Sequence, residues 1–341
     1  MRIEDFDYEL PAELIAQSPI EPRSAARLLV DRGEAPPEHR RIADLVEILQ
    51  PGDLLVVNDT RVIPARLRLR RASGGAVEVL LLEEISAGTW ECLIRPGGRL
   101  RSGETLVDSS GTPVVELLGR APAPAEGTFV VTTLLDTATL HSIGEVPLPP
   151  YIQGGPSDPE RYQTVYSDRP ASAAAPTAGL HFTPELLDRL AAAGVAMATV
   201  ELVIGLDTFR PVAVSDLDDH RMHTERYRVP SETMQACAAA QRVVAVGTTA
   251  TRALESAASR GELSGRTDLF IRPPYDWRVV DLMITNFHLP RTTLLVMIEA
   301  FIGRRWRALY ADAIVERYRM LSFGDAMLLD RHADPAAAPR H

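Results

Sequence analysis

Polar residues cluster where four predicted strands end. The clusters are Asn58-Asp59-Thr60-Arg61, Gly205-Leu206-Asp207-Thr208-Phe209-Arg210, Gly247-Thr248-Thr249-Ala250-Thr251-Arg252 and Thr285-Asn286-Phe287-His288-Leu289-Pro290. In an open α/β sheet, ligands bind at the carboxyl ends of the strands. Four such clusters are more than a sheet needs for its own stability, so they indicate a polar ligand site.

The segment Gly247-Thr248-Thr249 has a specific physical use. A glycine after a strand, followed by hydroxyl residues at a helix start, leaves backbone N–H groups free for an anion such as a phosphate or a carboxylate. Ordinary capping of a helix by threonine explains the same residues. The segment matches neither GxGxxG nor GxxxxGK[ST], so it indicates neither a dinucleotide site nor a P-loop.

Two histidines are candidate acids, because the pKa of histidine lies near neutrality. His181 precedes a predicted helix and His288 lies in a polar turn, although a hydrogen-bonded structural role is the commoner one for a lone histidine. The pair His220-x-x-His223 lies in a predicted loop with no fixed geometry, so no metal site is expected. The chain has no GxSxG elbow and no Cys–His signature, which argues against acyl transfer.

Composition excludes several other chemistries. The chain has 341 residues, and all 36 of its basic residues are arginine, so lysine Schiff bases and the Walker lysine are excluded. Cys92 and Cys237 lie far apart, which excludes a disulfide framework, a zinc ribbon and a cysteine-held iron–sulfur cluster. The acidic start MRIEDFDYEL and the lack of an 18-residue apolar stretch predict a cytoplasmic protein without a signal peptide or membrane partner.

The net charge of −10 argues against nucleic-acid binding by bulk charge, but not against a local basic surface. Two groups of arginines could form one: Arg61, Arg66, Arg68, Arg70 and Arg71, and Arg304, Arg305, Arg307, Arg317 and Arg319. On charge alone, an ordinary solvated surface explains both groups better.

The order of the expected elements indicates an α/β domain with an all-β insertion. Strands at 27–31 and 53–57 flank a helix at 42–49, and from about 66 to 148 short strands between turns predict an antiparallel barrel or sandwich. α/β alternation then resumes, which favours one interrupted domain over two in tandem. The later helices are expected at 184–193, 231–241, 253–259, 293–301 and 307–317, and the later strands at 195–204, 242–246, 268–272 and 279–284.

Longer motifs run in order over nearly the whole chain. They include Asp5-Phe6-Asp7-Tyr8-Glu9-Leu10-Pro11, the segment 51–66, Glu160-Arg161-Tyr162-Gln163-Thr164-Val165-Tyr166, the segment 174–183 and Phe323-Gly324-Asp325-Ala326-Met327-Leu328. With the segments 246–249 and 285–290, this set resembles the S-adenosylmethionine:tRNA ribosyltransferase-isomerase family of queuosine biosynthesis. The resemblance implies a mixed-sheet α/β catalytic domain, residues 1–64 and 152–341, with an inserted antiparallel β-barrel domain at 65–151.

The resemblance also implies a reaction. The ribosyl part of S-adenosylmethionine would pass to the aminomethyl group of 7-aminomethyl-7-deazaguanine in tRNA and isomerise, which gives epoxyqueuosine, adenine and methionine. The sulfonium acidifies the ribose C5′ hydrogens, so a general base can start the reaction and a proton donor near adenine can assist its departure. S-adenosylmethionine is the expected co-substrate, and no metal is expected.

Site roles follow from the resemblance as expectations. Gly247, Thr248 and Thr249 would hold the methionine carboxylate or a tRNA phosphate. Asn58, Asp59 and Arg61 would orient the ribose or the deazaguanine edge. His181, His288 and Asn286 would serve proton transfer at adenine. Asp281 or Glu255 would lie beneath them, with a strand-end salt bridge as the alternative for Asp281. The cofactor-binding set also includes Thr177, Thr208, Phe209 and Arg210.

The expected partner is a tRNA anticodon loop bearing the deazaguanine, with no obligate protein partner and a monomeric state. In this context the arginines at 61–71 would contact phosphates, and Tyr275 or Trp277 would stack on the flipped base. Val203 and Asp207 stand where the family usually has histidine and glycine, and Pro274 replaces a glycine. Two alternatives therefore remain: the same ribosyl chemistry on another amine or a free deazapurine, and a non-catalytic RNA-binding relative.

Overall fold

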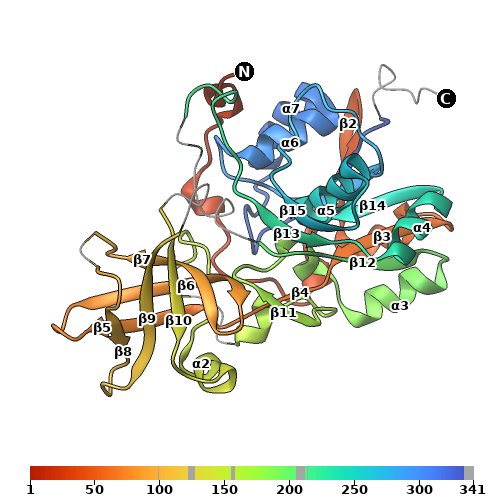
Figure 1. Ribbon diagram of the computed structural model, residues 1–341. Helices are drawn as coiled ribbons and strands as arrows, with labels where there is room; N and C mark the ends of the chain where they lie inside the picture. The colour runs from red at the N-terminus through yellow and green to blue at the C-terminus, as the bar shows by residue number, and fades with distance from the viewer. Residues whose placement is uncertain (99, 122–126, 155–157, 205–211, 213, 334–341) are drawn as a thin grey trace.

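A nine-stranded mixed sheet forms the centre of the part of the molecule that the structure describes (Figure 1). This computed structural model describes residues 1–98, 100–121, 127–154, 158–204, 212 and 214–333. The strand order is β15 (Ser264–Thr267), β13 (Glu225–Arg228), β12 (Ala196–Leu202), β3 (Asp53–Asn58), β14 (Arg242–Val246), β16 (Leu282–Asn286), β17 (Ala326–Asp330), β1 (Arg27–Arg32) and β2 (Ala35–Arg41).

The middle of this sheet is parallel. Strand β3 lies between β12 and β14, and β14 pairs with β16, all in the same direction. The carboxyl ends of these four strands therefore meet at one edge. All six residues of β3 are buried, because helices cover both faces of the sheet.

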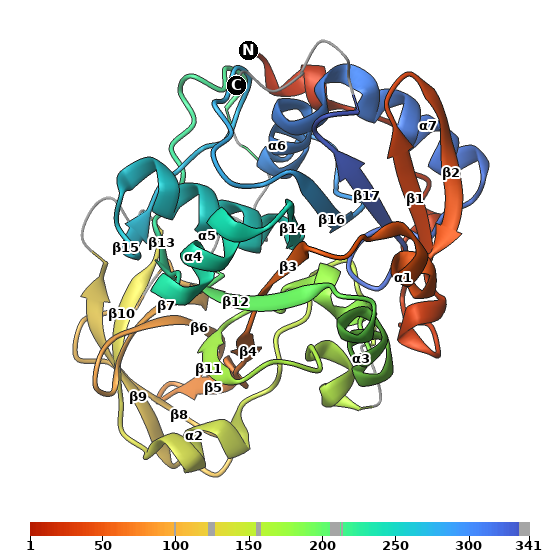
Figure 2. The same ribbon diagram turned by 90° about the vertical axis from the view of Figure 1, so that its right-hand side faces the viewer.

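The helices form two layers on opposite faces of the sheet (Figure 2). Along β3, Leu54 and Val56 face one hydrophobic cluster, while Leu55 and Val57 face the other. The first cluster includes α4 (Ser231–Ala239), α5 (Gly247–Arg260), α6 (Thr293–Ile302) and α7 (Trp306–Val315). The second includes α1 (Leu45–Ile48) and α3 (Pro184–Ala192). No helix among the described residues is long and apolar enough to cross a membrane.

A closed antiparallel barrel lies between β3 and β12 in the chain. Its strand order is β10 (Phe129–Thr133), β7 (Thr89–Arg95), β6 (Ala76–Ser86), β5 (Arg66–Arg71), β8 (Thr105–Val107) and β9 (Pro113–Arg120). On β5, Leu67 and Leu69 are buried in the barrel core while Arg68 and Arg70 are exposed. Helix α2 (Thr137–Ile143) adds Leu140 to the same core. The predicted fold class is thus confirmed.

A short parallel pair, β4 (Thr60–Val62) and β11 (Arg169–Ser172), holds the chain where it leaves for the barrel and returns. The barrel also contacts the sheet through Arg266 on β15, whose guanidinium donates to both carboxylate oxygens of Glu83 on β6, at 2.8 and 2.7 Å. Short 3₁₀ turns connect the larger elements: η1 (Ile3–Phe6), η2 (Ala12–Leu14), η3 (Arg23–Ala25), η4 (Ile42–Asp44), η5 (Pro159–Tyr162), η6 (Thr177–His181) and η8 (Gly303–Arg305).

Several elements differ from the sequence-based expectation. Helix α5 begins at Gly247, six residues earlier than expected, and the strand expected at 268–272 is replaced by β15 at Ser264–Thr267. Strand β16 begins at Leu282 rather than at 279. The cause is Glu255, whose carboxylate accepts the backbone N–H groups of residues 278–280, each at 3.0 Å, so these groups are not available to the sheet.

Candidate active site

A pocket opens at the carboxyl ends of β12, β14 and β16. The residues that line it include parts of η6, β12, β13, the start of α5, the loop after β16 and the start of α6, together with the segments around 149–151, 269–271 and 321–322. About 1180 Å³ of empty space lies inside it when its open mouth is included. The pocket is therefore an open hollow at the strand ends, lined by both polar and apolar side chains.

The first turn of α5 supplies one wall of the pocket. Gly247 has φ +88°, which a residue with a side chain rarely adopts, and this conformation turns the chain directly from β14 into the helix. Val246 stands at the N-cap and gives no side-chain hydrogen bond to the first turn, and the buried Oγ1 of Thr249 has no partner among the residues that the structure describes. The predicted anion-binding segment thus lines the pocket with polar groups still available.

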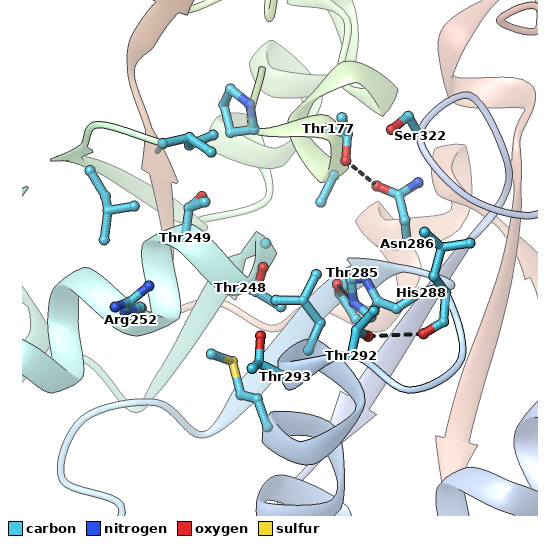
Figure 3. Close-up of a pocket in the computed structure, with 18 of the residues that line it drawn as sticks. Thr177, Thr248, Thr249, Arg252, Thr285, Asn286, His288, Thr292, Thr293 and Ser322 are labelled. Atoms are coloured by element: carbon cyan, nitrogen blue, oxygen red, sulfur yellow. Dashed lines mark hydrogen bonds between the residues drawn. The ribbon is translucent and has the colours of Figure 1, made fainter. Parts of the chain in front are cut away.

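Thr177, Asn286 and His181 form a hydrogen-bonded chain at the other side of the pocket. Figure 3 shows its Thr177–Asn286 hydrogen bond. The Thr177 hydroxyl donates to Asn286 Oδ1 at 3.0 Å, and Asn286 Nδ2 donates to His181 Nε2 at 3.1 Å. His181 therefore accepts at Nε2 and carries its proton on Nδ1. Burial, with smaller contributions from Arg319 and Arg23, lowers the pKa of His181 to about 4.

His288 lies at the same end of the pocket. Its Nε2 is 2.9 Å from the hydroxyl of Thr285, and burial lowers its pKa to about 3. Two tyrosines hold its backbone: Tyr8 donates to the carbonyl at 2.5 Å, and Tyr310 accepts from the amide at 2.9 Å. Because His181 and His288 are neutral at pH 7, neither holds the extra proton that an imidazolium could donate to a leaving group.

The structure brings seven of the predicted residues together at this pocket. Six of them line it, namely Gly247, Thr248, Thr249, Thr177, Asn286 and His288, and His181 is joined to it through Asn286. Thr208, Phe209 and Arg210, together with Asp207, lie outside the described residues.

Asp281 and Glu255 lie elsewhere, so the expectation that they lie beneath the histidines is wrong for this structure. Asp281 precedes β16 at the opposite end from Asn286, and its Oδ1 pairs with Arg331 at 3.0 Å and with His332 at 3.1 Å. This is the strand-end salt bridge that stood as the alternative. Glu255 is fully buried and holds the loop at 278–280.

Asn58, Asp59 and Arg61 do not line the pocket either. Buried Asn58 ties β3 to β12, since its Nδ2 donates to the carbonyl of Leu202 at 3.0 Å. The Arg61 guanidinium binds the carboxylate of Glu160 and donates to Ser167 at 3.1 Å. Asp59 is half-buried, and burial raises the pKa of its carboxyl. Asn58 and Arg61 stabilise the connection to the barrel, where the chain passes from β3 into β4.

The arginines expected to contact tRNA are largely paired with acids. Arg66, Arg68 and Arg71 form ion pairs with Glu78, Glu145 and Glu104 respectively, while Arg70 is exposed on β5. Tyr275 and Trp277 pack edge-to-face against each other and lie half-buried on the hydrophobic core, and their polar atoms bond to Glu255 and to the carbonyl of Ala300. Their contact with a flipped base therefore has no support in this arrangement.

Sequence reasoning gave no site role to four residues of this pocket, although Arg252 stands in one of the polar clusters at the strand ends. Arg252 and Glu225 form a buried ion pair in its wall, and Thr292 and Thr293 bring the start of α6 to it. Arg252 follows Thr248 by four residues, so a helix starting at Gly247 would have placed both on one face. No group of three or more His, Cys, Asp or Glu side chains in the described part of the chain could hold a metal ion.

Comparison with known proteins identifies the family of this chain. A family profile described as "queuosine biosynthesis protein" matches residues 3–329. The chain belongs to this family. It is 47% identical over 339 residues to the S-adenosylmethionine:tRNA ribosyltransferase-isomerase of Thermotoga maritima, with 96% of this chain and all of the relative covered. The enzymes of the same name from Synechococcus elongatus and Rubrobacter xylanophilus are 50% and 51% identical, and the matches cover 96% of this chain and 95% and 98% of the relatives.

A solved structure of a family member has the same fold. The crystal structure of the S-adenosylmethionine tRNA ribosyltransferase from Thermotoga maritima matches with a TM-score of 0.54 at 39% identity, and covers 95% of this chain and 99% of that one. The resemblance inferred from the motifs is thus confirmed for the family.

Proposed function

We propose that this chain transfers the ribosyl group of S-adenosylmethionine to the aminomethyl group of 7-aminomethyl-7-deazaguanine in tRNA and isomerises it to epoxyqueuosine, with release of adenine and methionine. The observation that carries the proposal is the pocket at the strand ends, where hydrogen-bonding groups stand in a largely apolar wall, in a chain that matches enzymes of that name over 96% of its length. The family and the pocket support the same activity.

The residues of the pocket fit a ligand of this kind. The free first turn of α5 and the unpartnered Thr249 hydroxyl suit a carboxylate, while Asn286, Thr285 and His288 offer the hydrogen-bonding edges that a purine needs. The sulfonium of S-adenosylmethionine supplies the acidity of the neighbouring ribose hydrogens. Bulky apolar side chains such as Leu202, Phe270 and Met297 exclude water from part of the wall.

We assign proton handling at adenine to His181, His288 and Asn286 as positioned hydrogen-bonding groups. The neutral imidazoles can donate an N–H to a purine nitrogen, because burial lowers their pKa values to about 4 and about 3 and so keeps them uncharged at pH 7. The Thr177–Asn286 hydrogen bond fixes the Asn286 amide so that it presents Nδ2 to His181. Asp281 and Glu255 take no part in this assignment.

The acceptor is proposed to be the deazaguanine in the anticodon loop, rather than a free base or another amine. Val203, one of the residues that departs from the family pattern, is buried and does not line the pocket, whereas its neighbours Leu202 and Ile204 do. The change from histidine to Val203 therefore removes no side chain from the pocket lining. We further propose a monomeric, cytoplasmic enzyme that needs no metal, with residues 65–151 as the inserted domain.

One incubation tests the proposal. The purified chain is mixed with S-adenosylmethionine and with tRNA that carries 7-aminomethyl-7-deazaguanine, and the nucleosides are then analysed. Epoxyqueuosine in the tRNA, with adenine released in equal amount, is the expected result. Adenine release without modified tRNA would support another acceptor, and no adenine release would support a non-catalytic relative.

A further inference from the structure

The pocket wall opposite His288 contains a buried ion pair. Arg252 Nη1 lies 2.6 Å from Glu225 Oε2, and the two side chains are 7% and 5% exposed. In Figure 3, Arg252 lies at one end of the drawn residues, and His288 and Ser322 lie at the other, with Thr248 and Thr249 between them. Both charged residues line the pocket. The long axis of the pocket therefore runs from a charged end to a neutral, hydrogen-bonding end.

Arg252 is held in place but keeps a donor free. Its Nη2 donates to the carbonyls of Thr267 at 3.3 Å and His223 at 3.4 Å, while no acceptor for the buried Nε lies in the described part of the chain. A buried donor without an acceptor costs free energy unless a ligand satisfies it. The Oγ1 of Thr249, on the same helix, is also buried and meets no hydrogen-bond partner among the described residues.

Fold stability alone is a poor reason for this ion pair. Removing two charges from water offsets much of their attraction, so a buried pair is often no more stable than apolar residues of the same size. In the wall of a pocket, such a pair presents a fixed dipole to a ligand. A ligand with both charges on one end complements that dipole.

We propose that Arg252 and Glu225 bind the amino-acid head group of S-adenosylmethionine, with the α-carboxylate on Arg252 and the α-ammonium facing Glu225. This inference rests on the proposed function. The first turn of α5 adds backbone N–H groups and the positive end of the helix dipole beside the carboxylate. The orientation places the nucleoside end toward Asn286 and His288.

The wild-type protein alone can test the proposal, with two ligands. Dissociation constants are measured by calorimetry for S-adenosylmethionine and for its analogue that lacks only the α-carboxylate. Because the analogue lacks this charge-assisted contact, its dissociation constant should be about 10- to 100-fold higher than that of S-adenosylmethionine. Equal affinities would overturn this inference alone. Failure of both ligands to bind would overturn the proposed function as well.

A pair of variants locates the contact. In Arg252→Met, the dissociation constant of S-adenosylmethionine should rise by about 10- to 100-fold, to that of the analogue, while the analogue changes by less than about threefold. The matched control is Arg242→Met, which breaks a comparable ion pair with Asp53, 2.6 Å long, at the amino end of β14. The control should leave both constants unchanged. Equal weakening of both ligands in Arg252→Met would overturn the assignment, and the wild-type comparison decides it independently if that variant does not fold.

Discussion

Removal of one hydroxyl from Tyr8 tests how the loop that carries His288 is held. The Tyr8 hydroxyl donates to the carbonyl of His288 at 2.5 Å, and its ring packs edge-to-face on Tyr310 with centroids 5.0 Å apart. Tyr8→Phe keeps the ring and removes only the hydrogen bond. The N-terminal segment and the pocket loop are joined a second time nearby, because the amide of Arg291 donates to the carbonyl of Phe6 at 2.9 Å.

The size of the effect follows from these contacts. A partly buried carbonyl left without its donor costs about 1–3 kcal/mol of unfolding free energy. A shift of about 1 Å in a group at the reacting centre can cost about 100-fold in rate. We expect kcat to fall by about tenfold or more while KM for S-adenosylmethionine changes by less than about threefold, since the head group is held elsewhere.

The assay is adenine release under steady-state conditions, together with urea unfolding. The matched control is Tyr227→Phe, because the Tyr227 hydroxyl also donates to a backbone carbonyl, that of Glu262 at 2.9 Å, but lies outside the pocket. The control should lose similar stability and keep its kcat. If Tyr8→Phe behaves as this control does, Tyr8 is a structural contact and the reasoning is refuted.

Three further predictions follow from the same structure. Gly247→Ala should lower the unfolding free energy by about 1 kcal/mol or more in urea, because φ is +88° there although a Cβ would have space, and an unchanged midpoint would contradict this. Burial lowers the pKa of His288 from 6.5 to about 3, so the folded state favours the neutral imidazole. The stabilisation that this gives is complete above about pH 6.5 and is lost as the pH falls toward 3. Urea unfolding of His288→Gln should therefore show a smaller loss of unfolding free energy between about pH 7 and pH 4 than wild type does. Asp281→Asn should keep turnover within about twofold while Asn286→Ala loses most of it, and equal losses in adenine release would refute the positions given to these two residues.

Much of the fold could be predicted because local chemistry agrees with the tertiary structure. Helix α3 has Thr183 as its N-cap, whose side chain accepts from Leu186 at 3.2 Å, and Gly194 follows its end, as the sequence indicates. Strand β3 reads as an apolar run because both of its faces are covered. Strands β2, β13 and β17 were missed, since β2 is exposed and rich in proline and charge, and β13 has only four residues.

The part of the site that lies at strand ends could be predicted from the sequence. Gly247 follows β14, Asn286 ends β16 and His288 lies two residues beyond it. Because parallel strands bring their ends together, position in the chain was enough to predict that these residues meet. Asp281 was placed wrongly because the start of β16 depends on Glu255, a contact between residues far apart in sequence. Arg252 and Glu225 were not assigned to the site because their pairing requires the helix start and the strand β13 to be known first.

The neighbours of β17 set an order of events for the growing chain. Strand β1, near the N-terminus, pairs with β17 near the C-terminus, and β17 also completes the edge of β16, from which the loop bearing His288 emerges. Strand β1 can pair early with β2, but its other edge must wait until β17 has been synthesised. In a chain whose synthesis stalls before Ala326, the barrel strands are all present but the sheet lacks β17. The edges of β1 and β16 that pair with β17 are then open to proteases and chaperones.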